Sequence, residues 1–213
     1  MKQIVCFGDS NTWGWDPRTC TRYGRDVRWP CLMQRLLGEE YEVAEDGISG
    51  RTGGVPDYAE PYKCGVDSID ACMMSNMPVD LVIIMLGIND TKVYLNASAR
   101  SIMKGIEQVA LHAENIDYGN GKKPKVLIAA PTPVGDYVEQ TWAVEAFDRS
   151  SVQKLKELAP MLKEVAEHRG WEFINAAELG ISPSEEDAMH LYPEGHRILA
   201  EAMAEKVREI FED

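Results

Sequence analysis

Five short apolar runs, separated by longer segments with helical spacing, indicate that strands and helices alternate along the chain. The strongest run, residues 80–86, is continuously apolar after its first residue. Such a run is typical of a central parallel strand that is buried on both faces. The other four predicted strands are residues 4–7, 41–44, 125–130 and 171–175.

Four helices are predicted between and after these strands, because apolar residues recur there at three- and four-residue spacing. Gly38 marks the end of one helix and Pro193 the first position of another. Pro160 falls inside a third and predicts a kink. The four predicted helices are residues 29–37, 98–115, 147–169 and 193–211.

The alternation predicts an α/β fold: a three-layer α/β/α sandwich around a five-stranded parallel sheet, flavodoxin-like, with right-handed crossovers. A chain of 213 residues without an internal repeat or linker fits one domain, so residues 1–213 are expected to form a single domain. Ligands of such sheets bind beyond the carboxyl ends of the strands. The long irregular stretches 16–28 and 53–63 are therefore expected to form pocket walls.

The formal net charge of −13 narrows the choice of partner. A surface this acidic repels nucleic-acid phosphates and anionic lipid head groups. We therefore expect a small-molecule substrate and neither nucleic acid nor a membrane surface as partner.

Cysteine and histidine usage predicts neither a disulfide framework nor a metal site. The cysteines are odd in number, are irregularly spaced and include no Cys-x-x-Cys pair, and no two histidines have a metal-ligand spacing. No cofactor is expected. The apolar run before Gly8 is too short for a signal-peptide core, and reduced thiols suit the cytosol, so we expect a cytoplasmic protein. The cysteines are Cys6, Cys20, Cys31, Cys64 and Cys72.

Four polar motifs fall at or after strand ends, where a site is expected. A serine hydrolase needs a nucleophile, a base, a group that orients the base, and donors for the oxyanion. Together the motifs supply all four. They are residues 8–11 (Gly-Asp-Ser-Asn), 47–52 (Gly-Ile-Ser-Gly-Arg-Thr), 87–90 (Gly-Ile-Asn-Asp) and 187–190 (Asp-Ala-Met-His).

Ser10 lies in a strand-to-helix turn and is the candidate nucleophile, and His190 is the candidate base. The Asp-x-x-His spacing lets Asp187 accept the imidazole N–H and fix its tautomer. The oxyanion donors would be the amide of Asn89 and the backbone N–H groups of Gly50 and Ser10. Taken one at a time, these residues suit a helix cap, a surface ion pair or a turn; their combination favours catalysis.

Other histidines compete less well for the role of base. His196 falls inside the last predicted helix with no acid at the same spacing. His112 and His168 lie on amphipathic helices and are expected to face solvent.

The four motifs resemble the signature blocks of the SGNH (GDSL-type) hydrolase family, with Ser10, Gly50, Asn89 and His190 in the four named positions and Asp187 as the acid. The sequence around residues 6–15, 26–29 and 81–92 is similar to the arylesterase and acyltransferase branch, which includes perhydrolases. Two departures stand out. An asparagine, Asn11, replaces the family's leucine, and an Ala-Met pair replaces the usual glycine and aliphatic residue before the histidine.

The resemblance implies a carboxylic-ester hydrolase, a serine esterase or acyltransferase that cleaves small acyl esters through an acyl-Ser10 intermediate. Trp13, Trp15 and Asn11 are expected to contact substrate, whereas Trp29, on a predicted helix, is expected in the core. A carbohydrate deacetylase acting on acetylated sugars would use the same triad. A homo-oligomer is compatible with the family, but stretch 16–28 looks shorter than in the transferase members.

A non-enzymatic alternative is a flavodoxin-like module whose loop 8–12 cradles a phosphate or nucleotide. The chain has neither a Gly-x-Gly-x-x-Gly motif nor a P-loop. That reading also leaves Asp187 and His190 without a role.

Overall fold

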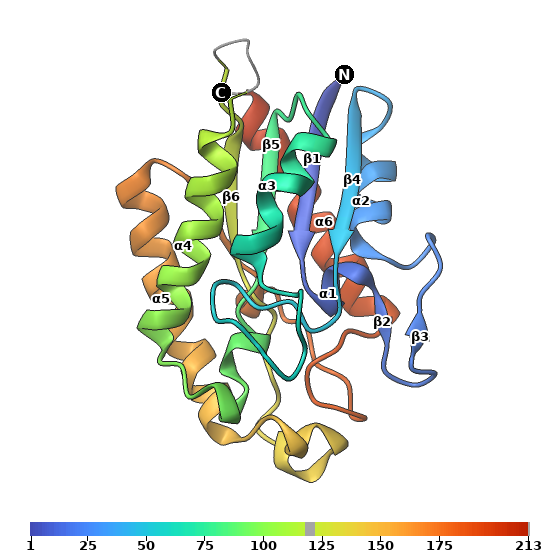
Figure 1. The fold of residues 1–213 in the computed structure, drawn as a ribbon. Coiled ribbons are helices and arrows are strands. Elements are labelled where there is room, and N and C mark those ends of the chain that lie inside the picture. The colour runs from blue at the N-terminus through green and yellow to red at the C-terminus, as the bar shows by residue number, and fades with distance from the viewer. Residues whose placement is uncertain (118–121, 213) are drawn as a thin grey trace.

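The computed structural model describes residues 1–117 and 122–212 and contains a five-stranded parallel sheet (Figure 1). The strand order is β4-β1-β5-β6-β7, so the chain reverses its direction across the sheet at β1. In open sheets of this kind, ligands bind beside that point, beyond the carboxyl ends of the strands. The predicted α/β sandwich is confirmed. The strands are β1 (Lys2–Gly8), β4 (Tyr41–Gly47), β5 (Leu81–Met85), β6 (Lys125–Ala130) and β7 (Glu172–Asn175).

Helices cover both faces of the sheet, as Figure 1 shows. Helices α3 (Gly65–Ser75), α4 (Ala99–Asn115) and α5 (Arg149–Arg169) pack on one face, and α2 (Trp29–Leu37) and α6 (Pro193–Glu212) on the other. Alternate side chains of each strand enter opposite cores, because successive residues of a strand point to opposite faces. In β1, Val5 and Phe7 enter the first core, while Ile4 and Cys6 enter the second.

Several elements differ from the predictions at their ends. Strand β4 continues three residues beyond the predicted end because Glu45 and Asp46, although polar, still pair with β1 and bind Arg28 and Arg51. Helix α3 was not predicted. It buries Ile69, Cys72 and Met73, which recur at three- and four-residue spacing. Helix α5 runs through Pro160 without a break.

Stretch 16–28, expected as a pocket wall, instead contains most of a small hairpin. Short 3₁₀ helices occupy other connections. These remaining elements are α1 (Ser10–Trp13), β2 (Trp15–Asp16), β3 (Thr21–Arg22), η1 (Asn89–Thr91), η2 (Val93–Leu95), η3 (Val138–Gln140), η4 (Trp142–Glu145) and η5 (Ala176–Glu178). Across residues 1–117 and 122–212, no helix combines the length and the apolar character that crossing a membrane requires.

Candidate active site

The parallel register brings three of the four motifs to one edge of the sheet. Gly8, the last residue of β1, aligns with Gly47 of β4 on one side and with Met85 of β5 on the other. Ser10, Gly50 and Asn89 each follow one of these strand ends and line a common pocket. Both chain termini lie at the opposite end of the sheet (Figure 1).

Ser10 is the first residue of the single-turn helix α1, directly after β1. The side chain of Asp9 caps this helix by accepting the Asn11 N–H at 3.0 Å. The turn is so tight that a Cβ on Gly8 would lie 2.1 Å from Thr12 Oγ1. The backbone N–H of Ser10 therefore sits at a helix N-terminus, where it and the helix dipole favour a negative charge.

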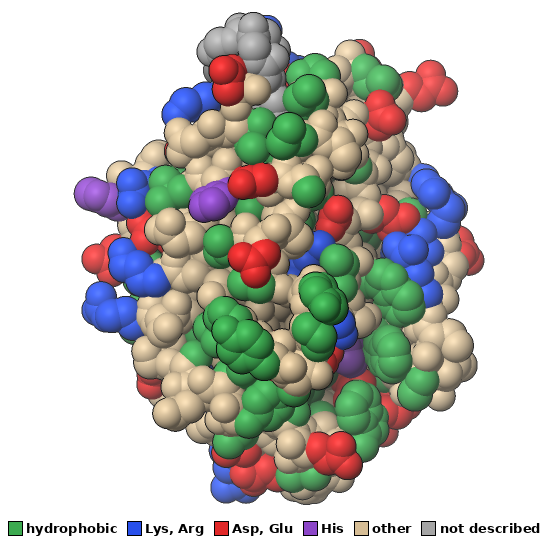
Figure 2. All heavy atoms as spheres, in the orientation of Figure 1, with side chains coloured by type: hydrophobic (Ala, Val, Ile, Leu, Met, Phe, Trp, Pro, Cys, Tyr) green, Lys and Arg blue, Asp and Glu red, His purple; other side chains and the backbone are tan. Residues whose placement is uncertain are grey.

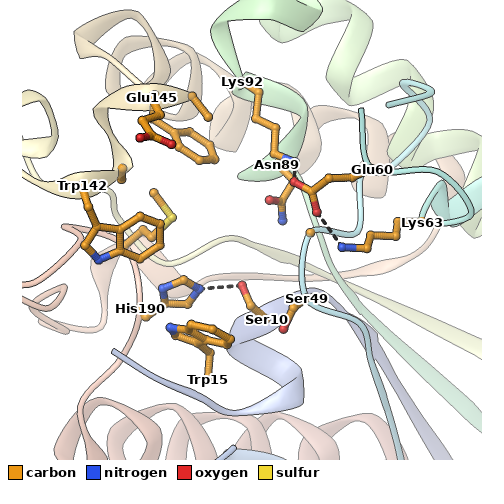
Figure 3. Close-up of a pocket in the computed structure, with 15 residues that line it drawn as sticks. Ser10, Trp15, Ser49, Glu60, Lys63, Asn89, Lys92, Trp142, Glu145 and His190 are labelled. Atoms are coloured by element: carbon orange, nitrogen blue, oxygen red, sulfur yellow. Dashed lines mark hydrogen bonds and ion pairs between the residues drawn. The ribbon is translucent and has the colours of Figure 1, made fainter. Parts of the chain in front are cut away.

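Ser10, His190 and Asp187 form a hydrogen-bonded series. The Ser10 Oγ lies 2.8 Å from His190 Nε2 (Figure 3), and His190 Nδ1 lies 2.6 Å from Asp187 Oδ2. Each of the three side chains is buried. An ionised carboxylate can only accept, so Nδ1 donates to Asp187, and Nε2 of the neutral ring is left to accept the Ser10 hydroxyl proton.

Asp187 is held as a carboxylate by the turn that follows it. Burial alone would raise its pKa, but hydrogen bonding and charge attraction from His190, with further donation from the His190 N–H and the Ser184 hydroxyl, lower the pKa to about 2. A carboxyl whose folded-state pKa lies below its usual value of about 3.9 stabilises the fold above that pH. This contribution is lost as the pH falls from about 4 towards 2.

Ala188 adopts a left-handed backbone conformation within this turn, with a φ of +63°. Residues with a side chain rarely adopt it, whereas glycine does so readily. The left-handed conformation explains why the family that the motifs resemble usually has glycine at this position. Despite the substitution, the turn still directs His190 towards Ser10.

The three groups predicted as oxyanion donors belong to residues that line the same pocket as Ser10 Oγ. Gly50 and Asn89 both line the pocket, and Figure 3 shows the Asn89 amide pointing towards Ser10. Within the described part of the chain, neither the Asn89 amide nor the backbone N–H groups of Ser10 and Gly50 have a hydrogen-bond partner. Gly50 has a φ of +87°, a conformation that favours glycine.

The pocket has a volume of about 330 Å³ and two contrasting sides. Trp15, Trp142, Phe147 and Met189 supply apolar surface, and Figure 2 shows hydrophobic side chains bordering the opening. The opposite side, beyond Asn89, carries the charged residues Glu60, Lys63 and Lys92, whereas Glu145 lies on the side of Trp142, as Figure 3 shows.

The predicted substrate-contacting residues separate in the structure. Trp15 lines the pocket, with its ring 5.7 Å from that of His190. Trp13 does not line it and packs against Trp15 and the Arg22 guanidinium. The prediction for Asn11 needs correction as well. Asn11 is buried, and its amide donates to the Met189 carbonyl at 3.2 Å and to Thr132 at 3.3 Å. Asn11 therefore connects the turn that carries Ser10 to the residue before His190.

The remaining aromatic and histidine residues are placed as follows. Trp29 is fully buried in the second core, as predicted. His196 is also fully buried, with its ring edge-on to Tyr23; burial, then the charges of His190 and Arg28, lower its pKa to about 3. His168 is exposed, whereas His112 is half-buried and faces Asp70.

Sequence reasoning missed the pocket residues that lie outside strand ends. Trp142 belongs to η4, where no local pattern marked it, and Phe147 was predicted only as the start of a helix. Stretch 53–63 was expected as a wall and does contribute Glu60 and Lys63, whereas stretch 16–28 contributes no lining residue. In the described ranges, no group of three or more His, Cys, Asp or Glu side chains could hold a metal ion.

A serine, a histidine and an aspartate hydrogen-bonded in series beside a pocket define the class of serine hydrolases. The chain belongs to the GDSL-like lipase/acylhydrolase family, whose model matches residues 6–198. The family predicted from the motifs is thereby confirmed.

Solved structures similar to this chain include esterases. An aryl esterase of M. smegmatis has a TM-score of 0.91 and 34% identity, with 98% of this chain and 99% of that one covered. A carbohydrate acetylesterase of Sinorhizobium meliloti has a TM-score of 0.88 and 32% identity, with 99% of this chain and 100% of that one covered. An acetylxylan esterase of Xylanibacter ruminicola is 26% identical over 223 residues, covering 97% of this chain and 43% of that protein. The chain thus spans less than half the length of this curated relative.

Proposed function

We propose that the protein is a carboxylic-ester hydrolase that acts through an acyl-Ser10 intermediate. The observation that carries this proposal is the hydrogen-bonded series from Ser10 through His190 to Asp187 at the pocket floor. Family membership and the similarity to arylesterases and carbohydrate acetylesterases support it.

In the first half-reaction, His190 Nε2 takes the Ser10 proton as Oγ attacks the ester carbonyl carbon. The former carbonyl oxygen then carries a negative charge, which the Ser10 and Gly50 N–H groups and the Asn89 amide stabilise. His190 returns the proton to the leaving alcohol as the ester bond breaks. In the second half, His190 activates water, which releases the acid and restores Ser10. Another alcohol in place of water gives acyl transfer.

We further propose that residues 1–213 act as a single domain in the cytoplasm, on a small ester. A pocket of about 330 Å³ suits a small molecule. The net charge of −13 disfavours nucleic acid and anionic membranes as partners. All five cysteines are free thiols, which suits a reducing compartment.

Replacing Asn89 by alanine tests the oxyanion role. Removing one preorganised donor typically lowers kcat by about 10²–10³-fold, and we expect a loss of that order with little change in KM. Initial rates on p-nitrophenyl acetate give both constants. Asn115→Ala, at the exposed end of α4, is the matched control. A raised KM with an unchanged kcat would show that Asn89 binds substrate and does not stabilise the oxyanion.

A second candidate activity is removal of acetyl groups from carbohydrate. Exposed aromatic residues occur on segments that contribute to the pocket: Trp142 lines it, Tyr58 and Tyr62 belong to the loop that carries Glu60, and Tyr94 is two residues after Lys92. Tyr58 and Tyr62 are 91% and 97% exposed. Exposed apolar surface of this kind marks binding sites, and aromatic faces suit sugar rings.

For this activity, kcat/KM should be far higher on acetylated xylo-oligosaccharides than on p-nitrophenyl acetate. Trp142→Ala should lower kcat/KM on the acetylated sugar by up to about tenfold, because one aromatic stacking interaction contributes about that much. The loss on the aryl ester should be smaller. Acetate release measured on both substrates decides this. Faster hydrolysis of the aryl ester would reject the carbohydrate assignment.

A further inference from the structure

The Gly50 and Asn89 donors lie on two loops that the sheet does not hold together directly. Gly50 follows β4 and Asn89 follows β5, and β1 lies between these two strands. The distance between the two donors therefore depends on contacts between the loops themselves. An oxyanion hole works only if its donors stay aimed at one point.

Lys92 connects the Asn89 segment to loop 53–63. It follows η1, and its backbone N–H donates to the Asn89 carbonyl. Its side chain is only 3% exposed, and Nζ donates to Asp57 Oδ2 at 2.8 Å and to Glu60 Oε1 at 2.5 Å. Burial lowers the pKa of Lys92, but the hydrogen bonds and charges of Asp57 and Glu60 raise it by more. The net pKa is therefore raised, and the ammonium stays charged.

Glu60 extends this connection to Gly50. Its second carboxylate oxygen, Oε2, binds Lys63 Nζ at 2.6 Å, and a Cβ on Gly50 would lie 2.3 Å from that oxygen (Figure 3). The carboxylate thus packs directly on the Gly50 Cα. A continuous path of contacts runs from Asn89 through Lys92 and Glu60 to Gly50.

The loop that carries Glu60 is itself fixed at its base and at its turn. Thr52 pairs with Cys64, where the Thr52 N–H donates to the Lys63 carbonyl at 3.2 Å. Within the loop, Asp57 Oδ1 accepts the backbone N–H groups of Ala59 and Glu60. Glu60 is therefore held where it meets both Lys92 and Gly50.

We propose that Lys92, acting through Glu60, is a positioning residue that holds the Gly50 and Asn89 donors at a fixed spacing. This inference rests on the proposed function. A second connection, from the Asp90 carboxylate to the Gly53 N–H at 2.7 Å, keeps the loop base attached when Lys92 is changed. Loss of Lys92 should therefore misplace the donors without detaching the loop.

The test compares Lys92→Met, Lys92→Arg and Glu60→Gln with the wild type. Because a displacement of about 1 Å can cost about 10²-fold in rate, we expect Lys92→Met to lower kcat about 10- to 100-fold with KM nearly unchanged. Phenylboronic acid, which forms a tetrahedral adduct on the serine and fills the oxyanion hole, should bind more weakly by a similar factor. Lys92→Arg, which keeps the charge and donors, should recover most of kcat.

Glu60→Gln should give a smaller loss of the same kind and is informative even if Lys92→Met does not fold, because Glu60 is partly exposed. Glu107→Gln is the matched control, because Glu107 is a buried glutamate of α4 that pairs with Lys104 of the same helix and with Arg169 of α5. The kcat of this variant should equal that of the wild type.

Wild-type kcat and boronate affinity in folded Lys92→Met, or in Glu60→Gln if the former does not fold, would overturn the positioning role. A raised KM alone would instead make Lys92 a substrate-binding residue and also overturn it. If Asn89→Ala loses activity in the same assays, the proposed function stands and only this inference fails. If the wild type lacks esterase activity, both fail.

Discussion

Ser10→Ala is expected to reduce p-nitrophenyl acetate hydrolysis to the background rate, a loss of about 10⁶-fold in kcat. Without Oγ no acyl-enzyme can form, and the oxyanion donors and pocket alone recover only a small part of the rate. The fold should persist, because the Ser10 side-chain hydrogen bond is made to His190 and not to a strand or core group.

Steady-state rates and thermal unfolding of the variant check this prediction together. Ser101→Ala, an exposed serine in α4, serves as the control and should retain full activity. A folded Ser10→Ala protein that keeps a substantial part of wild-type kcat would exclude Ser10 as the nucleophile.

Asp187→Asn is expected to lower kcat by about 10⁴-fold, the effect of neutralising the acid of such a triad. An asparagine amide can donate to Nδ1, which then favours the tautomer with its proton on Nε2. That tautomer cannot accept the Ser10 proton. The substitution also removes the negative charge that stabilises the imidazolium formed during attack.

The chain offers a matched control in Asp70→Asn. Asp70 faces His112 at 3.2 Å, also an aspartate–histidine pair, but both side chains are half exposed and lie outside the pocket. Its kcat should be unchanged. An Asp187→Asn variant with near wild-type kcat would show that Asp187 only supports the turn before His190.

Much of the fold was predictable because buried parallel strands give continuous apolar runs. Residues 125–130 were predicted as a strand with the observed bounds of β6. Prediction failed where polar side chains are buried in pairs. Strand β4 extends over Glu45 and Asp46, which form ion pairs with Arg28 and Arg51. A search for apolar runs does not find strand residues of this kind.

The same reason separates the site residues that were anticipated from those that were not. The motifs that hold Ser10, Gly50 and Asn89 were found because strand ends meet at one edge of a parallel sheet, and His190 was found from its spacing to Asp187. Lys92 was not singled out, because its carboxylate partners lie more than thirty positions earlier in the sequence. Asn11 was expected to contact substrate, but its side-chain amide donates to the Met189 carbonyl instead.

The most direct measurement is labelling with a fluorophosphonate probe, followed by peptide mapping of the modified residue by mass spectrometry. The probe reacts with a serine whose hydroxyl is activated by a neighbouring base. We predict a single adduct on Ser10, absent in Ser10→Ala and strongly slowed in Asp187→Asn. An adduct on another residue, or ester hydrolysis without any labelling of Ser10, would contradict the proposed mechanism.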